Sequence, residues 1–307
     1  MSITALAPAT VHQTPMTPPP VLAPAPGSGS PMPLPLPGWG AADALAALQE
    51  AGPLLPVPLA DPTVVSALTT VVLRAGAYAV KVYPPGTDPD HLSRLTAALG
   101  GSTAAHLPCA PPVVTGHGVL VLSEWLPAGG PVSWSGLGSL LRRFHDQHAG
   151  TPMVAWTPLS RLAGQAALLP PDVAGVLLEA QAALLAALAD VRSELGEGLI
   201  HGDVSPSNVI GTPDGPRLID LDWVARAPRE YDLSSASRRF RAGEIPRRAY
   251  AGFCRGYGFD VCSWPGLAVL DRIADLGGVA FRIWDSLHHG RGLHWLDEEL
   301  RGWRTPL

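Results

Sequence analysis

The apolar residues of this chain of 307 residues change their spacing once, near residue 131. Before that point they are mostly β-branched and fall in short runs at 64–73, 78–83 and 113–122, as is typical of antiparallel strands. After it they recur at helical spacing, beginning with the apolar face at 137–144. The sequence therefore predicts an α+β fold with two lobes, a small antiparallel sheet lobe and a larger helical lobe, with a cleft between them.

Composition divides the chain into three segments. Residues 1–38 contain eleven prolines and no Asp, Glu, Lys or Arg, so they are expected to stay disordered or polyproline-like. Such a tail is either a bland extension or a proline-rich ligand for a partner domain, and the first interpretation is favoured. Residues 39–126 are expected to form the N-terminal sheet lobe, which opens with a short helix at 41–49. Residues 127–307 are expected to form the C-terminal helical lobe.

Net charge and cysteine content exclude several classes of protein. A formal net charge of −5 gives no overall basic field for nucleic acid or an anionic membrane. No uninterrupted apolar run reaches the ~20 residues of a spanning helix. The three cysteines, Cys109, Cys254 and Cys262, are too few and too scattered for a disulfide framework or a thiolate zinc site. Because the first residues lack the basic region of a signal peptide, the sequence indicates a cytoplasmic protein with reduced thiols.

Lysine occurs once, as Lys81, among 21 basic residues, and all the others are arginine. Lys81 lies within the second predicted strand, between two valines. A lysine ammonium is a compact point charge that reaches a phosphate oxygen inside a narrow cleft, which a planar guanidinium does less well. On composition alone, drift in an arginine-rich chain explains the single lysine equally well.

The densest group of chemically active side chains lies within residues 199–222. Two short apolar runs joined by a turn at 213–215 predict a tight hairpin. Asp203 lies on the loop before it, Asn208 begins its first strand and Asp220 ends its second strand, so the three side chains are expected to converge. A carboxylate that accepts a hydroxyl proton and hard oxygen ligands for Mg²⁺ are what phosphoryl transfer requires.

The order His-Gly-Asp at 201–203, then Asn208, then Ile-Asp at 219–220 resembles the motif of the aminoglycoside phosphotransferases and choline kinases. These are kinase-like enzymes that phosphorylate small molecules. By position, Asp203 corresponds to the catalytic base, and Asn208 and Asp220 correspond to the magnesium ligands. The resemblance implies a protein-kinase-like fold, Mg²⁺ and ATP (or GTP) as cofactors, and a hydroxyl group of an antibiotic or metabolite as the acceptor.

The same resemblance spans residues 64–290 and assigns further roles. It implies that the N-terminal lobe, 39–126, binds the nucleotide and that the C-terminal lobe, 127–307, carries the catalytic residues and the substrate site. His201 and Asp232 correspond to residues that support the catalytic loop, and Asp222 is expected beside the metal ligands. Lys81 corresponds to the phosphate-binding lysine, which favours a functional reason for its being unique. A phosphate loop and a hinge for adenine are expected to bind the nucleotide, and they comprise Ser66, Thr69, Thr70, Ser123, Glu124 and Trp125.

Two features depart from the pattern of that family. The helix predicted at 88–99, after Lys81, has no glutamate to pair with it, so either Asp88 or Asp90 takes its place or the alignment with the family slips here. The phosphate loop has no glycine, so backbone amides and threonine hydroxyls are expected to cover the phosphates. These departures favour an alternative, a catalytically inactive kinase-like binding or regulatory module. The intact catalytic motif favours an enzyme more strongly.

Two further features bear on the substrate. Only eleven residues separate Asp220 from Asp232, too few for the long activation segment with which a protein kinase docks a peptide. The arginine-rich segment 238–248 either contacts an anionic substrate or forms a solvated face, and the solvated face is favoured. The expected partner is therefore a small molecule, whose identity the sequence leaves open.

Overall fold

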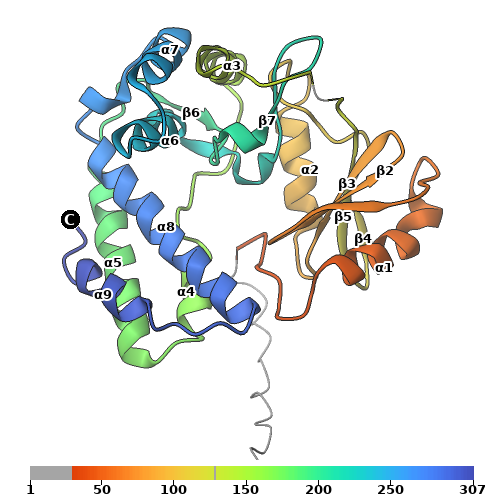
Figure 1. The fold of residues 1–307 in the computed structure, drawn as a ribbon, viewed down its shortest axis with the longest axis horizontal. Helices are drawn as coiled ribbons and strands as arrows, with labels where there is room; N and C mark the ends of the chain where they lie inside the picture. Colours follow the sequence, from red (N-terminus) through yellow and green to blue (C-terminus); the bar gives the residue numbers. More distant parts are fainter. Residues whose placement is uncertain (1–29, 128) are drawn as a thin grey trace, which may run out of the picture.

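The computed structural model describes residues 30–127 and 129–307, which form two lobes (Figure 1). A small lobe on the right of Figure 1 is built on a five-stranded sheet, and a larger lobe of helices lies on the left. The predicted α+β arrangement of a sheet lobe and a helical lobe is confirmed.

The sheet has the strand order β1-β2-β3-β5-β4, with all neighbours antiparallel. The apolar run at 64–73, predicted as one strand, is two strands because the chain turns at 68–70. In β3 the buried Val80 and Val82 lie on one face, so Lys81 and Tyr83 lie on the other. The strands are β1 (Thr63–Ala67), β2 (Val71–Ala75), β3 (Tyr78–Tyr83), β4 (Val113–Thr115) and β5 (Gly118–Glu124).

One helix covers each face of this sheet (Figure 1). Helix α1 (Ala41–Ala51) is followed by the 3₁₀ turn η1 (Gly52–Leu54), and it packs Ala44, Ala47 and Leu48 against the face that carries Val80 and Val82. Helix α2 (Pro89–Ala98) packs on the opposite face, in a core that also contains side chains of the helical lobe. The face of β3 that carries Lys81 therefore looks toward the other lobe.

The helical lobe has its core between α5 and α8, where Leu177, Leu184, Leu270 and Ile273 are buried. Helices α3 and α7 lie side by side at the top of Figure 1. A Cβ atom at Gly256 would lie 2.2 Å from the carbonyl oxygen of Ser135, so a glycine is needed there. The helices are α3 (Trp134–Gln147), α4 (Leu162–Ala166), α5 (Pro171–Ala189), α6 (Glu230–Arg241), α7 (Arg247–Tyr257), α8 (Leu267–His288) and α9 (Leu296–Trp303), with a 3₁₀ turn η4 (Val261–Ser263) before α8.

Short elements between α5 and α6 shape the part of the helical lobe that faces the sheet lobe. Two small antiparallel ladders, β6 with β9 and β7 with β8, hold this segment. Asn208 lies in a 3₁₀ turn before β7 and Asp220 lies beyond β8, so neither belongs to the strand predicted for it. The elements are β6 (Glu197–Ile200), η2 (Pro206–Asn208), β7 (Val209–Ile210), β8 (Arg217–Leu218), η3 (Leu221–Trp223) and β9 (Ala225–Pro228).

Residues 30–38, the end of the proline-rich segment, contact both lobes. The carbonyl oxygen of Pro31 accepts a hydrogen bond of 2.8 Å from the N–H of Asp88, at the start of α2. Met32 is 2% exposed, and its carbonyl oxygen accepts a 2.7 Å bond from the helical lobe's Arg161 Nε. The sequence predicted no such packing, because a proline-rich segment without charged residues shows no periodic apolar pattern that would indicate a buried face. The rest of the predicted disordered tail, residues 1–29, lies outside the described residues.

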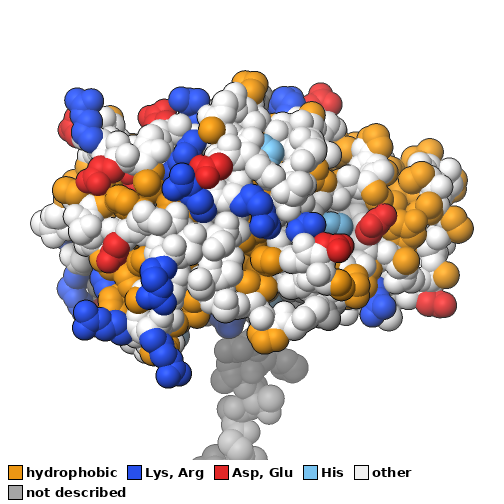
Figure 2. All heavy atoms as spheres, turned by 90° about the horizontal axis from the view of Figure 1, so that it is seen from above, with side chains coloured by type: hydrophobic (Ala, Val, Ile, Leu, Met, Phe, Trp, Pro, Cys, Tyr) orange, Lys and Arg blue, Asp and Glu red, His pale blue; other side chains and the backbone are white. Residues whose placement is uncertain are grey.

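Helix α5, the exposed surface of the sheet lobe and the three cysteines complete the description. Helix α5 has the length and composition of a membrane-crossing helix, with a mean hydropathy of 1.6, but its Leu177, Ala180 and Leu184 are buried in the core of the helical lobe. Apolar side chains gather over the sheet lobe, at the right of Figure 2, where β1 is exposed along its whole length. All three cysteines are free thiols, as expected.

Candidate active site

A tight turn presents Asp203 to the space between the lobes. Strand β6 ends at Ile200, and Gly202 follows in the left-handed region with φ of 85°. A Cβ atom on Gly202 would lie 2.4 Å from the carbonyl oxygen of Trp223, so this position requires glycine. The turn brings Asp203 to an exposed position while His201 stays fully buried.

Asp232 bonds the backbone of this turn. Its carboxylate accepts hydrogen bonds from the N–H of His201 (2.6 Å) and the N–H of Gly202 (2.8 Å). The same carboxylate lies 2.9 Å from Nε2 of His145, which is fully buried. His201 in turn bonds the carbonyl oxygen of Ile219 through Nε2 (2.9 Å), so it ties the catalytic loop to the residue before Asp220.

Asn208 lies beside Asp203. Its Nδ2 donates to the carbonyl oxygen of Asp203 at 2.8 Å and to Oδ2 of Asp203 at 3.0 Å. The amide nitrogen is thereby committed to Asp203, and the amide oxygen of Asn208 is left to bind another group.

Asp220 adopts a conformation that is uncommon for a residue with a side chain. Its φ and ψ are 61° and 60°, in the left-handed region, just before the turn η3. Residues held there often belong to functional sites, because the surrounding structure must stabilise the strained backbone. Its carboxylate is 39% exposed and meets the Lys81 ammonium at 2.5 Å.

Lys81 is paired with carboxylates of the helical lobe. Its Nζ lies 2.5 Å from Oδ1 of Asp220 and 2.6 Å from Oδ2 of Asp222. The prediction that Asp88 or Asp90 pairs with Lys81 is therefore wrong. Asp88 instead caps α2 by accepting from the N–H of Asp90 (2.9 Å), and its other oxygen meets Arg94 at 3.1 Å.

The charges of this cluster shift the pKa values of its members. Desolvation works against the charge of Lys81, but the nearby carboxylates, Asp222 foremost, raise its pKa well above the usual value. Desolvation and the negative charge of Asp220 raise the pKa of Asp203. A carboxyl group with a raised pKa accepts a proton more readily than an ordinary one, which suits a general base.

The donor set fits a magnesium ion that arrives with a nucleotide. Asp220 and the amide oxygen of Asn208 are hard oxygen ligands, and Mg²⁺ usually takes one or two carboxylates from the protein and the rest from phosphates and water. Among the described residues, no cluster of three or more His, Cys, Asp or Glu side chains is arranged to hold a metal. The protein groups alone thus form an incomplete site.

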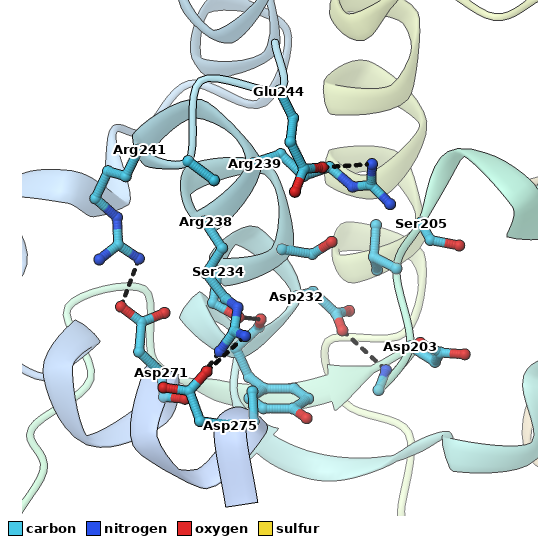
Figure 3. A pocket seen from close by; sticks show the side chains of 16 residues that line it. Asp203, Ser205, Asp232, Ser234, Arg238, Arg239, Arg241, Glu244, Asp271 and Asp275 are labelled. Carbon is cyan, nitrogen blue, oxygen red and sulfur yellow. Dashed lines mark hydrogen bonds and ion pairs between the residues drawn. The ribbon is translucent and has the colours of Figure 1, made fainter. Parts of the chain in front are cut away.

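A cavity of about 610 Å³ opens beside Asp203, between the catalytic loop, α6 and α8 (Figure 3). Three arginines and five acidic residues, Asp203 and Asp232 among them, line it, and each arginine is paired with one of the other three acids. The pairs are Arg238 with Asp275 (2.7 Å), Arg239 with Glu244 (3.0 Å) and Arg241 with Asp271 (2.5 Å). These arginines belong to the segment for which a solvated face was favoured; their side chains are 35–46% exposed, and they also line the cavity.

The residues predicted to bind phosphates lie on β1 and the turn after it. Ser66 pairs with Val72 and Val72 with Lys81, so the three residues form one row across three strands, with side chains on the same face. Thr69 and Thr70 follow in the turn, where the N–H of Leu68 donates to the carbonyl oxygen of Thr70 (2.9 Å). Their contact with phosphate stays a prediction.

The predicted adenine hinge lies at the end of β5, where the chain leaves the sheet lobe. Ser123 pairs with Ala79, the carbonyl oxygen of Glu124 accepts from His106 (2.8 Å), and the N–H of Trp125 donates to Ala77 (2.7 Å). The carbonyl oxygen of Trp125 and the N–H of the next residue bond no other described residue. Of these backbone groups, the last two are the ones open to a base.

Two contributions to the site were not predicted. Tyr83 donates a 2.7 Å hydrogen bond to Asp222, and its position two residues after Lys81 on one strand is a signal that could have revealed it. Tyr231, which lines the cavity, carried no such signal, because its place depends on how α6 packs beside α8.

A model of the phosphotransferase enzyme family matches residues 40–273, which span both lobes and the whole catalytic motif. The chain belongs to the phosphotransferase enzyme family. The resemblance noted in the sequence is confirmed by this match. A search of curated proteins finds no match.

Solved structures of this phosphotransferase fold are similar at low identity. The amicoumacin kinase hAmiN, in complex with AMP-PNP, Ca²⁺ and Ami, has a TM-score of 0.63 and 15% identity over 80% of this chain and 86% of its own. A choline/ethanolamine kinase family protein from Mesorhizobium loti has a TM-score of 0.57 and 15% identity, over 85% and 92%. The choline kinase LicA from Streptococcus pneumoniae has a TM-score of 0.56 and 12% identity, over 86% of this chain and 98% of its own. The predicted kinase-like fold is confirmed.

Proposed function

We propose that this phosphotransferase transfers the γ-phosphoryl group of ATP (or GTP), with Mg²⁺, to a hydroxyl group of a small molecule. The observation that carries the proposal is a cluster of two bonded pairs: Asn208 bonds Asp203 within the helical lobe, and Lys81 of the sheet lobe bonds Asp220, whose charge acts on Asp203. Catalysis of phosphoryl transfer consists mainly of positioning and charge stabilisation, which such a cluster supplies.

Each side chain has a distinct role in the proposed reaction. Asp203 accepts the proton of the acceptor hydroxyl. The oxygen of that hydroxyl forms a bond to the γ-phosphorus, and the bond between this phosphorus and the leaving nucleoside diphosphate breaks. Asn208 keeps the Asp203 carboxylate in place through Nδ2. Asp220 and the Asn208 amide oxygen would hold Mg²⁺, which neutralises phosphate charge when bound. Lys81 contacts the phosphates from the sheet lobe, as a slim ammonium can.

The cavity beside Asp203 is the proposed acceptor site. Its size, about 610 Å³, is in the range of small-molecule sites. Three acids of its wall, Asp271, Asp275 and Glu244, are paired with the three arginines, and Asp203 and Asp232 give the wall a surplus of acid. The acceptor is thus an antibiotic or metabolite with a reachable hydroxyl group, and the charge of the wall does not exclude the polycationic aminoglycosides.

A screen for nucleotide consumption tests the proposal. The chain, with Mg²⁺ and ATP or GTP, is incubated with a panel of hydroxylated metabolites and antibiotics, and Asp203→Asn serves as the inactive control. We expect release of nucleoside diphosphate that depends on one class of acceptor and is lost in the variant. Tight Mg²⁺-nucleotide binding without turnover on any acceptor would support the inactive module, and no nucleotide binding at all would overturn both.

A further inference from the structure

Lys81 has no acidic partner on the helix that packs beside it. Of the two acids near the start of α2, Asp88 is committed to the helix cap and to Arg94, and Asp90 lies on the exposed side. Both carboxylates that contact Lys81 come from the other lobe, from Asp220 and Asp222. What keeps the ammonium in place must therefore be sought in those two residues.

Asp222 is held more firmly than Asp220. Its Oδ2 lies 2.6 Å from the Lys81 ammonium, and its Oδ1 accepts a 2.7 Å hydrogen bond from the hydroxyl of Tyr83. Its side chain is only 14% exposed, against 39% for Asp220. Asp220 bonds Lys81 through Oδ1 alone, and it is the residue proposed to bind Mg²⁺.

Tyr83 contacts both members of the Lys81–Asp222 pair. It follows Lys81 by two residues on β3, so both side chains leave the same face of the strand. The Lys81 ammonium lies 5.0 Å from the centre of the Tyr83 ring, within the range of a cation–π contact. Tyr83 is 4% exposed, so water does not compete for its hydroxyl.

We propose that Asp222 and Tyr83 form a fixed holder for Lys81. Tyr83 orients the carboxylate of Asp222, and Asp222 keeps the ammonium in place when a cation takes the carboxylate of Asp220. Both act as positioning residues. That Lys81 binds the phosphates of a nucleotide is taken from the proposed function. The pair thereby replaces the glutamate that α2 lacks as the partner of Lys81.

The single lysine makes a direct test feasible. Lysine labelled with ¹³C at Cε gives this chain one lysine signal, that of Lys81, in its NMR spectrum without any nucleotide. Tyr83→Phe removes the hydroxyl and keeps the ring, and we expect the Lys81 signal to move. The matched control is Tyr78→Phe on the same strand, whose hydroxyl makes no hydrogen bond with described residues, and the signal should stay where it is.

Nucleotide affinity gives the second readout, measured by titration of AMP-PNP with and without Mg²⁺. A hydrogen bond to a charged group contributes enough free energy for its loss to change a Kd about ten-fold. We therefore expect Tyr83→Phe to raise the Kd for AMP-PNP by about that factor, and Asp222→Asn to raise it at least as much. The thermal midpoint of each variant checks that it is folded. If Asp222 were a metal ligand instead, Asp222→Asn would weaken only the binding of AMP-PNP with Mg²⁺, and the Kd without Mg²⁺ would stay at the wild-type value.

The outcomes separate the two proposals. Wild-type Lys81 signals and wild-type Kd values in both Tyr83→Phe and Asp222→Asn would overturn the holder. A wild-type chain that binds no Mg²⁺-AMP-PNP, while Tyr83→Phe still moves the Lys81 signal, would overturn the proposed function and leave the holder standing.

Discussion

The side-chain amide of Asn208 donates to two oxygens of Asp203, the carbonyl at 2.8 Å and Oδ2 at 3.0 Å. One residue proposed as a metal ligand therefore also fixes the residue proposed as the base. Because Nδ2 is committed to Asp203, the amide oxygen of Asn208 is the atom free to face the cation. Base and metal site are coupled through a single side chain.

Replacement of Asp203 should separate chemistry from binding. In Asp203→Asn the side chain keeps its size but accepts a proton poorly, so we expect phosphoryl transfer to fall by about 10²–10⁴-fold. Binding of Mg²⁺-nucleotide should be retained, because Asp203 is not assigned to the metal. Steady-state turnover and nucleotide titration measure the two effects. The control is Asp214→Asn, an exposed residue of the turn after β7, and equal turnover in both variants would contradict the role of Asp203.

Replacement of Asp220 should instead abolish the metal dependence of nucleotide binding. Asp220→Ala removes the proposed carboxylate ligand, so adding Mg²⁺ should no longer strengthen binding of AMP-PNP. Calorimetry with and without Mg²⁺ makes the comparison. A variant that binds Mg²⁺-AMP-PNP as tightly as the wild type would place the metal elsewhere.

Arginine should not replace the single lysine. The Lys81 ammonium fits between Asp220 and Asp222, at 2.5 and 2.6 Å, beside the ring of Tyr83. A planar guanidinium needs more room, so we expect Lys81→Arg to lose nucleotide use almost as fully as Lys81→Ala. Arg74→Lys, an exposed exchange on the neighbouring strand β2, is the control and should act like the wild type. Near-normal turnover in Lys81→Arg would remove the argument drawn from the single lysine.

Residues 30–38 should contribute to stability, although their composition favoured a bland extension. Met32 is 2% exposed in the core shared by the lobes, so Met32→Ala should lower the free energy of unfolding by about 2–5 kcal/mol. Leu36→Ala, at a side chain 60% exposed, should change it by less than about 0.5 kcal/mol. Urea denaturation of the two variants makes the comparison, and equal midpoints would show that the contacts of Met32 are immaterial.

The sequence predicted those parts of the site whose residues are close along the chain. Asp203 and Asn208 lie on one loop, so spacing alone brings them together, and Lys81 was marked by being unique. The partners of Lys81 were predicted wrongly because Asp220 and Asp222 are 139 and 141 residues away. Which acid meets that ammonium depends on how the lobes pack, and local spacing carries no information about it.

The same reasoning explains the other differences. Met32 lies in a segment whose composition predicts no core, and it packs in a cluster of buried side chains that come from both lobes. The arginines of α6 face a cavity because α8 supplies matching acids, at positions that show no pattern in the sequence. The spacing of apolar residues, by contrast, was sufficient to predict the sheet and the main helices, because it depends only on which face of a single strand or helix is buried.

A crystal structure of the chain with Mg²⁺ and AMP-PNP tests the central claim most directly. We expect the nucleotide between the lobes, with Mg²⁺ about 2.0–2.1 Å from an Asp220 oxygen and from the Asn208 amide oxygen. Lys81 should contact a phosphate oxygen, and Asp203 should face the γ-phosphate across the mouth of the cavity. A metal held by other residues, or a nucleotide bound away from Asp203 and Lys81, would contradict the account.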